Sequence, residues 1–430
     1  MKFTLPEDAF PDVNLSKQHQ EALIAEADTI IRETIAANEE FLADGEALKD
    51  QSWRLVRTKD GLKVYHQRRP STGSSRKSSK SQKSGSFTLD SQLASLSTNP
   101  TSSGQKHHLE ASDEEVSVSS SASDKVRRPG GFHMILNGTV DGTLDDCMYG
   151  TFAATNQAWM WRSSHINDRL DDARVLATIS KPTEKDPFQF LGVKWFVKER
   201  PAMLTGIVQQ RDYLILEATG LTRDSKGERV GYYLMHSIAL PGIIPNLDEL
   251  GLLRGELSLC FIDRQTGPSK VTKYCRSFSN PKGKIPDRVA VAVTADSLIC
   301  AAKVVDYAYI KKLTWFMKHE RQSQRQTETS RPKCCDVCNK NFAKFGFTAA
   351  GYGASCQICH RALCSKCNIT KKMTVDVSGT GAVKQVALRF CLGCVREAKA
   401  KSVWEMALSG VETSSEASST SGSARSGPLR

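Results

Sequence analysis

The chain has 430 residues, which is enough for two or three domains. Hydrophobic residues make up 39% of it and charged residues 25%, and no run approaches 18 consecutive apolar residues, so a transmembrane helix is not expected. The formal net charge of +12 favours an anionic partner, either nucleic acid or an acidic membrane surface, although simple solubility explains such a charge equally well.

The N-terminal part predicts a helix, a hairpin and a long serine-rich insert. Apolar residues at helical spacing predict a helix over residues 15–43, with Ser16 as its N-cap. Two runs of alternating polarity within 52–67 flank an Asp60-Gly61 turn and predict a β-hairpin. Residues 71–128 are rich in serine and poor in aromatic residues. This stretch cannot bury enough apolar surface to offset its ordering entropy, so we expect it to be disordered.

The central part of the chain predicts a large, mostly antiparallel sheet, because closely spaced strand patterns are separated by turn signals. A short helix is expected at 144–152, between the first two of these strands. The predicted strands cover residues 133–140, 173–180, 192–197, 202–209, 213–218, 231–239, 256–263 and 270–277.

A long amphipathic helix is predicted over residues 285–318, with Pro286 near its start. A sheet closed by such a helix leaves either a cavity or a packed core between the two. The apolar loop 240–245 is then either the mouth of that cavity or a turn that packs into the core. Arg162 lies beside Trp159 and Trp161 and could meet a ligand, but we expect it on an edge strand in solvent.

Three motifs in this region resemble START lipid-transfer domains. Residues 280–286 (Asn-Pro-Lys-Gly-Lys-Ile-Pro) resemble the family's Pro-x-Gly-x-Ile-Pro motif, and Arg211-Asp212-Tyr213 resembles its Arg-Asp-aromatic strand start. Trp53, followed by the hairpin, resembles the opening of such a domain. The resemblance implies an α+β helix-grip fold over residues 1–320, in which a curved antiparallel sheet wraps around the C-terminal helix. An internal tunnel would hold one lipid or other hydrophobic ligand, whose contact residues are unknown.

Eight cysteines near the C-terminus form four Cys-x-x-Cys pairs. Two such pairs supply the four thiolates of a closed tetrahedral Zn²⁺ site, so four pairs predict two structural zinc ions. A closed site has no open coordination position, which argues against metal catalysis. The pairs are Cys335/Cys338, Cys356/Cys359, Cys364/Cys367 and Cys391/Cys394.

Disulfides are the alternative use of these cysteines. The first ten residues contain no apolar stretch typical of a secretory signal, so we expect the thiols to stay reduced. Cys334 makes the first pair ambiguous, and Cys335 is preferred because it stands two residues before Cys338. His360 is a further possible ligand, but the four pairs are already complete and we expect it on the surface.

Residues 333–402 resemble a FYVE-type zinc finger. The resemblance lies in the Cys-x2-Cys-x4-Cys-x2-Cys spacing of residues 356–367, in Leu363 and in Arg389-Phe390-Cys391. It implies a small treble-clef, cross-brace finger in which the first and third pairs hold one zinc and the second and fourth pairs hold the other. A sequential pairing stays open. A RING ubiquitin-ligase finger also uses a cross-brace, but its second ligand group usually spaces Cys and His one residue apart.

The phosphoinositide signature of FYVE fingers is absent from this sequence. No Trp-x-x-Asp element precedes the first pair, and residues 353–357 carry no positive charge. Because Arg and Lys donors dominate phosphate recognition, we do not expect specific binding of phosphatidylinositol 3-phosphate. Weak attraction to an acidic membrane remains. The candidate residues for it are Arg361, Lys371, Lys372 and Arg389.

These features predict a cytoplasmic lipid-binding or lipid-transfer protein, or a membrane adaptor, that can lie peripherally on endosomal or other membranes. No enzymatic activity is expected, because no Gly-x-Ser-x-Gly elbow, P-loop or His-Glu-x-x-His motif occurs. A protein-interaction scaffold with a filled cavity and a RING-like ubiquitin ligase are the alternatives. The expected partners are a lipid and an acidic membrane surface or protein, not nucleic acid. Residues 321–332 are a predicted linker and 409–430 a predicted disordered tail.

Overall fold

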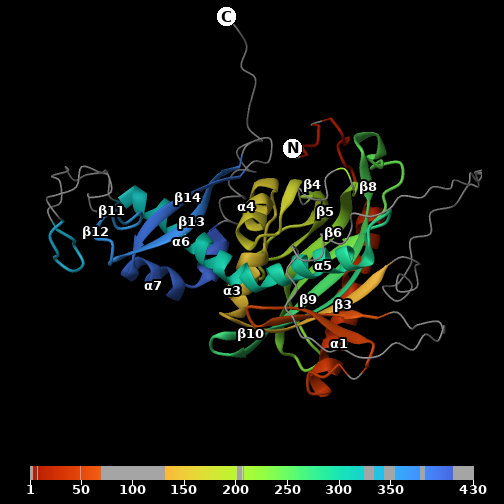
Figure 1. Cartoon of the computed structure of the whole chain (residues 1–430), viewed down its shortest axis with the longest axis horizontal. Coiled ribbons are helices and arrows are strands. Elements are labelled where there is room, and N and C mark those ends of the chain that lie inside the picture. The colour runs from red at the N-terminus through yellow and green to blue at the C-terminus, as the bar shows by residue number, and fades with distance from the viewer. Residues whose placement is uncertain are drawn as a thin grey trace, which may run out of the picture.

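A computed structural model of the chain describes residues 3–6, 8–48, 50–68, 131–200, 206, 208–323, 334–342, 354–377 and 383–409. A large sheet domain and a smaller cysteine module lie next to each other along the long axis of the molecule, and helix α6 (Val304–Ser323) runs from one to the other (Figure 1). The predicted disordered insert at 71–128, residues 324–332 of the predicted linker, and the tail from residue 410 lie outside the described residues.

Ten strands form one sheet among the described residues, in the order β1-β2-β3-β10-β9-β7-β6-β5-β4. All neighbours pair antiparallel except the short β8, which pairs parallel with β6. The predicted α+β class and large antiparallel sheet are therefore confirmed. The strands are β1 (Trp53–Lys59), β2 (Leu62–Gln67), β3 (Phe132–Asp141), β4 (Leu170–Ser180), β5 (Phe190–Lys198), β6 (Gln210–Arg223), β7 (Arg229–Ser237), β8 (Leu252–Arg254), β9 (Glu256–Gly267) and β10 (Lys270–Asn280).

The predicted strand at 202–209 is wrong where the structure describes it. Gly206 has a φ of 82°, and residues 208 and 209 adopt no strand. A left-handed glycine interrupts extended backbone, so the chain turns before β6 begins at Gln210. The other positions of that predicted strand, apart from 206, 208 and 209, lie outside the described residues.

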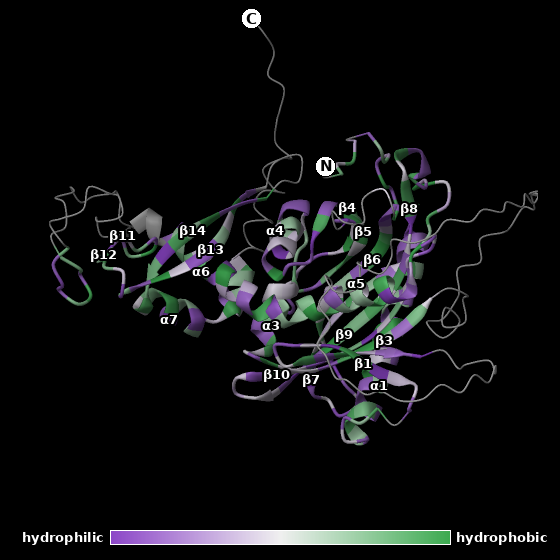
Figure 2. Ribbon diagram, in the orientation of Figure 1, coloured by the Kyte–Doolittle hydropathy of each residue, from purple (hydrophilic) through white to green (hydrophobic). Residues whose placement is uncertain are grey.

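The two faces of the sheet bury different helices. Alternate residues of a strand point to opposite faces, so Trp195 and Leu214 join α1 (Lys17–Ala43) while Phe196 and Ile215 face α4 (Asn156–Ile166). Figure 2 shows hydrophobic residues concentrated on the central strands β5, β6 and β9. The predicted N-terminal helix is confirmed, and its cap is Ser16, whose Oγ accepts a hydrogen bond from the N–H of His19 at 3.2 Å.

The predicted long C-terminal helix is broken into three pieces. These are α5 (Asp287–Ile299), a 3₁₀ turn at Cys300–Lys303 and α6. No proline or glycine marks this break, so the sequence pattern carried no signal for it. The predicted short helix is present as α3 (Leu144–Thr151). It lies so close to the start of α6 that a Cβ at Gly150 would come within 1.9 Å of the Val304 carbonyl oxygen.

The cysteine module contains two small hairpins and a helix, and its apolar side chains continue the core of the sheet domain. Leu363, Met373 and Phe390 of the module share one hydrophobic cluster with Leu313 and Phe316 of α6. In the part of the chain that the structure describes, no helix is both long and apolar enough to span a bilayer. The module's elements are β11 (Ala354–Ser355), β12 (Ala362–Leu363), β13 (Asn368–Val377), β14 (Val383–Cys391) and α7 (Leu392–Ala400), and residues 403–409 are helical.

Candidate functional site

The first two Cys-x-x-Cys pairs form turns of the same geometry. The N–H of Cys335 donates to the carbonyl of Lys340, and the N–H of Cys356 donates to that of Arg361, both at 2.9 Å. The residue after each second cysteine has a positive φ, 55° at Asn339 and 57° at His360. Such a turn points two sulfur atoms the same way. The repeated geometry explains why a two-residue spacing is needed in both pairs.

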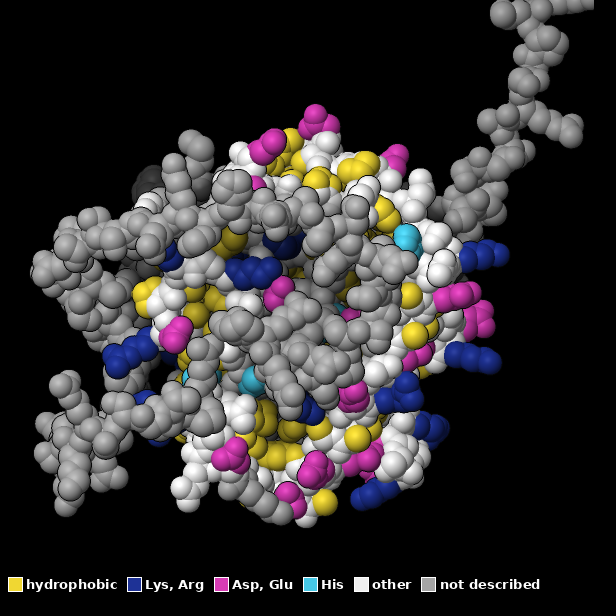
Figure 3. All heavy atoms as spheres, turned by 90° about the vertical axis from the view of Figure 1, so that its right-hand side faces the viewer, with side chains coloured by type: hydrophobic (Ala, Val, Ile, Leu, Met, Phe, Trp, Pro, Cys, Tyr) yellow, Lys and Arg dark blue, Asp and Glu magenta, His cyan; other side chains and the backbone are white. Residues whose placement is uncertain are grey.

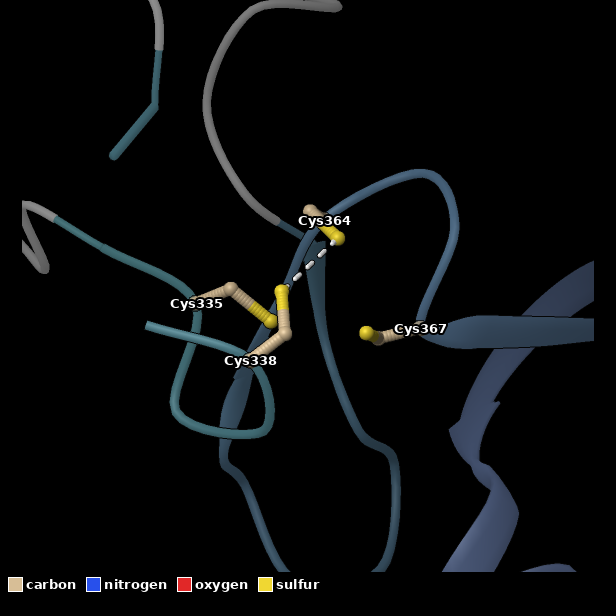
Figure 4. A group of neighbouring side chains, drawn as sticks. All are labelled: Cys335, Cys338, Cys364 and Cys367. Atoms are coloured by element: carbon tan, nitrogen blue, oxygen red, sulfur yellow. Dashed lines mark hydrogen bonds between the residues drawn. The ribbon is translucent and has the colours of Figure 1, made fainter. Parts of the chain in front are cut away.

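The eight cysteines gather into two groups of four, and the ligand atoms of each group lie within 4.8 Å of one another. The Sγ atoms of Cys338 and Cys364 are 3.7 Å apart (Figure 4), and those of Cys359 and Cys391 are 3.8 Å apart. Sulfur atoms placed about 2.3 Å from one tetrahedral zinc ion lie about 3.8 Å from each other, whereas a disulfide brings them to about 2.05 Å. The groups are Cys335, Cys338, Cys364, Cys367 and Cys356, Cys359, Cys391, Cys394.

The grouping is interleaved and follows the cross-brace that the family resemblance implies, not the sequential alternative. All thirteen cysteines lie in the described part of the chain, and each has a free thiol. Cys334 stands outside both groups, as does His360, which is exposed. The residues present therefore suit two metal ions that prefer four thiolate ligands.

Backbone N–H groups favour the thiolate form in both groups. Burial opposes the charged form of Cys335, but N–H groups of Cys364, Val337 and Cys338 outweigh it and lower the pKa of this thiol to about 6. In the second group, burial is outweighed by N–H groups that include that of Cys391, which donates to Cys356 Sγ at 3.3 Å and lowers the Cys356 pKa. The thiolate is the metal ligand, and these two thiols favour it, whereas a hydrogen bond with the Cys338 side chain raises the pKa of Cys367 and burial raises that of Cys394.

The last pair of cysteines begins helix α7. Cys391 is the N-cap, and its sulfur accepts a hydrogen bond from the N–H of Cys394 at 3.3 Å. The second group therefore combines a Cys-x-x-Cys turn, the β13–β14 hairpin and a helix N-terminus. The type of finger, a treble clef, stays a prediction.

The four candidates for attraction to an acidic membrane do not share one face. All four are exposed, but Arg361 follows the second cysteine turn while the other three lie on the β13–β14 hairpin. Arg389 pairs with Thr370, which places it on the face of Lys372 and opposite to Lys371. At the far end of the sheet domain, acidic and basic side chains are interspersed where described residues are visible (Figure 3).

A cavity of ≈130 Å³ lies between the inner face of the sheet, α4 and α5. Its apolar wall comes from β7, β9 and α5, and it carries side chains such as Met235, Leu259 and Val293. Three cations and two carboxylates also line it. They are Arg162, Lys198, Lys273, Asp168 and Asp263.

Behind this cavity is a fully buried charge cluster centred on Glu217. Lys194 Nζ lies 2.6 Å from one carboxylate oxygen of Glu217, and Arg162 lies 3.6 Å from the other. Arg162 also donates to the Thr151 carbonyl and, at 3.1 Å, to the hydroxyl of Tyr233. Arg162 Nε, although buried, has no hydrogen-bond partner among the described residues. An unpaired buried donor beside an apolar cavity is a group that a polar ligand atom can satisfy.

The charges of this cluster shift one another's pKa. Burial lowers the pKa of Lys194 to about 8 against the opposing attraction of Glu217. Burial also acts against charged Arg162, but Tyr233 and Glu217 outweigh it and raise the Arg162 pKa. Lys273 behaves like Arg162. Burial lowers its pKa, but the paired carboxylate of Asp263 has the larger effect, so the Lys273 pKa is raised.

The prediction of a solvated edge-strand Arg162 is wrong. The residue lies on α4, which begins at the Thr155 cap and ends at Asn167, whose φ is 65°. Its side chain is 3% exposed. Sequence reasoning also missed Lys194 and Glu217. The available signal was a charged residue inside an otherwise apolar strand run, which normally indicates a buried pair.

The loop 240–245 packs into the core through two of its residues. Leu240 and Ile244 are buried in the cluster beneath α1, on the sheet face opposite to the cavity. The core-packing alternative is therefore correct for these two side chains, and the loop is not the mouth of the cavity.

Two of the sequence motifs contact each other directly. Arg211 at the start of β6 donates from Nε to the carbonyl of Pro281 at 3.0 Å and from a terminal nitrogen to that of Lys282 at 3.1 Å. The next residue, Asp212, is fully buried and accepts from Trp195 Nε1 at 2.7 Å and Arg254 Nε at 2.8 Å. Arg211 thus fastens the loop that leads into α5, the helix that covers the cavity, while Asp212 joins β5 and β8.

No protein-family model matches the chain, and neither does any curated protein sequence at a significant level. Similar solved structures include human STARD10 (12% identity, 66% of this chain and 84% of that chain, TM-score 0.35). Human StAR-related lipid transfer protein 5 is 14% identical, and the match covers 65% of this chain and 97% of that chain with a TM-score of 0.36. The lipid transfer and protein localization domain of human StarD13 is 12% identical, and the match covers 63% of this chain and 93% of that chain with a TM-score of 0.32.

Proposed function

We propose that the sheet domain binds a small hydrophobic molecule with a polar end, such as a single lipid, and that the cysteine module binds two structural zinc ions. The observation that carries the first part is the cavity with apolar walls and the unpartnered Nε of Arg162 beside it. Burying apolar ligand surface there contributes about 25 cal/mol per Å², and the polar groups orient the ligand. The role is non-catalytic: lipid binding, lipid transfer or membrane adaptation.

The size of the cavity favours a second candidate function. Small-molecule sites typically have volumes of about 300–1,000 Å³, so the ≈130 Å³ here is too small for a complete lipid. Either α5 shifts outward when a ligand enters, or the sheet domain is a scaffold whose interior is filled by its own side chains. The intact ion pairs around the cavity support the scaffold alternative.

Lipid extraction from the full-length protein separates these two functions. The zinc-loaded chain is purified from eukaryotic cells, and bound lipid is measured by mass spectrometry. Binding of a fluorescent single-chain fatty acid is then titrated. Val293→Trp fills the cavity from α5, while Arg288→Trp places the same side chain on the exposed part of that helix as a matched control.

Lipid binding predicts a stoichiometric ligand that is lost in Val293→Trp and kept in Arg288→Trp. The scaffold function predicts no bound lipid in the wild-type protein or in either variant. Zinc is measured in parallel by atomic absorption. A folded, reduced protein that contains no zinc would remove the second part of the proposal without affecting the first.

A further inference from the structure

A second pocket of ≈400 Å³ lies at the seam between the sheet domain and the cysteine module. It is about three times the volume of the interior cavity and has no residue in common with it. Four groups of elements form its walls: α4, α6, the β13–β14 hairpin and α7. Neither the interior cavity nor the metal groups require such a space.

Three lysines on the module side line this pocket: Lys371 and Lys372 on β13 and Lys399 near the end of α7. None of them forms an ion pair in the described part of the chain, whereas Lys312 and Lys401 both do. Asp306 is the one carboxylate in the wall. The formal charge of the wall is therefore three minus one, or +2. Lys371 and Lys372 leave β13 on opposite faces, so they line the pocket from either side of this strand, and an anion between positive side chains would be stabilised.

The walls are held in place by contacts across the seam. Ser164 Oγ and Thr374 Oγ1 lie 2.9 Å apart, and the N–H of Thr374 donates to His165 Nε2 at 3.2 Å. On the other side, Lys312 Nζ donates to the Lys399 carbonyl at 3.0 Å and pairs with Asp146 at 2.9 Å. Lys399 Nζ itself lies 4.8 Å from the centre of the Tyr309 ring. A pocket whose walls are fixed loses little entropy when it binds a ligand.

We propose that this seam pocket binds a phosphate monoester, carried either by a soluble molecule or by a lipid headgroup. A phosphate monoester has a charge of about −1.5 to −2 at neutral pH, which matches the +2 of the wall. Its oxygen atoms can accept hydrogen bonds from lysine ammonium groups and from the side-chain amides of Asn167 and Gln385 in the wall. Because residues from both parts of the molecule line the pocket, the ligand would contact both.

The test uses the full-length, zinc-loaded protein and two kinds of probe. Glycerol 3-phosphate is titrated calorimetrically as the soluble probe. Phosphatidylcholine vesicles containing phosphatidic acid are the membrane probe, and vesicles with phosphatidylserine, which lacks a monoester, are their control. The triple variant Lys371→Gln, Lys372→Gln, Lys399→Gln is compared with Lys366→Gln, Lys384→Gln, Lys401→Gln, which removes three module lysines that do not line the pocket.

The proposal predicts that the pocket variant binds the phosphate monoester about 100-fold more weakly, since each well-placed lysine contributes on the order of fivefold. The control variant should keep its affinity. Binding of glycerol 3-phosphate would identify a soluble source, and selective binding of phosphatidic acid vesicles a lipid source. Equal losses in the two triple variants, or no binding of either probe, would overturn the proposal. Both variants are first checked for two zinc ions, so a folding defect is recognised separately.

Discussion

Glu217 is a single carboxylate that balances two buried cations. It is fully buried and pairs with Lys194 at 2.6 Å and with Arg162 at 3.6 Å. Removing one partner of a buried ion pair leaves an uncompensated charge, so Glu217→Gln should lower the free energy of unfolding by about 3–5 kcal/mol. Urea denaturation measures this. The exposed pair of Glu199 with Arg169 gives the control, and Glu199→Gln should change stability by less than about 1 kcal/mol. Equal effects of the two substitutions would contradict the proposed balance.

Arg211 holds the loop that leads into α5. It donates hydrogen bonds to the carbonyls of Gln209, Pro281 and Lys282, and only the planar guanidinium can reach all three. Arg211→Lys should therefore raise the amide exchange rates of residues 282–290 while strand β10 stays protected. Hydrogen exchange with mass spectrometry checks this, and Arg288→Lys on the exposed side of α5 is the control. Unchanged exchange at the start of α5 would show that the contact is incidental.

At the scale of single residues, the sequence predicted those whose role depends on close neighbours in the chain. The Cys-x-x-Cys pairs are set by local turns, so their spacing alone indicated the four pairs, whereas the interleaved grouping was implied only by the family resemblance. Arg162 could not be placed, because its partners Thr151, Tyr233 and Glu217 come from elements separated in the chain by up to 71 residues. Burial of a charged group depends on such distant partners, and no local pattern encodes them.

Among the elements, the contact between α4 and β13 contains a titratable group. His165 stacks on Tyr307 with ring centres 5.1 Å apart, and its Nε2 accepts from the Thr374 N–H, so the ring must be neutral. Burial lowers the His165 pKa to about 4 from 6.5. The unfolded chain therefore takes up this proton first, and the stability that His165 contributes is complete above pH 6.5 and is lost as pH falls toward 4.

We accordingly expect the protection of the Thr374 amide, corrected for intrinsic exchange, to fall as pH is lowered from about 6.5. His165→Phe keeps the stacking on Tyr307 but can neither accept the hydrogen bond nor take up a proton. In this variant the protection of the Thr374 amide should therefore be lower at neutral pH and should not change with pH across this range. Zinc content is followed throughout, because thiolate protonation also releases metal at low pH. A wild-type profile as flat as that of the variant would refute the assignment.

Most elements were predictable, and the two misses have different causes. Ser16 and the Asp60-Gly61 turn are local signals, and they began a helix and joined two strands as expected. The turn at Gly206 also had a local signal, which is the glycine itself. The break at Cys300–Lys303 had none, because no proline or glycine marks it. Periodicity reports which face of a segment is apolar, and it does not report where tertiary packing interrupts the segment.

For the whole molecule, the cysteine module should stabilise the sheet domain. Both share one hydrophobic cluster that includes Leu313 and Phe316 of α6 and Phe390 of β14. If metal supplies the folding energy of the module, Cys364→Ser should release zinc and also expose α6 to exchange. The thermal unfolding temperature of the full chain should fall by several degrees. Cys334→Ser, which lies outside both groups, is the matched control and should retain two zinc ions.

This coupling would be absent if the module were an independent appendage. In that case Cys364→Ser would change exchange only in residues 334–409 and leave the sheet domain's unfolding transition in place. The shared cluster was not predictable from the sequence, because Leu313 and Phe390 are 77 positions apart and each fits an ordinary amphipathic pattern. An interface between domains is built from such residues and is recognised only once both partners are seen.

If the cysteine groups bind metal as proposed, their interleaving also sets an order for loading it as the chain leaves the ribosome. The group that contains Cys335 is complete once Cys367 has emerged, while the group that contains Cys356 must wait for Cys394, a further 27 residues of synthesis. During that interval Cys356 and Cys359 would have no metal ion, while the neighbouring group of four cysteines would already be complete. Nascent chains halted within this window should carry a single ion, and a premature stop before Cys391 would leave a permanently half-loaded module.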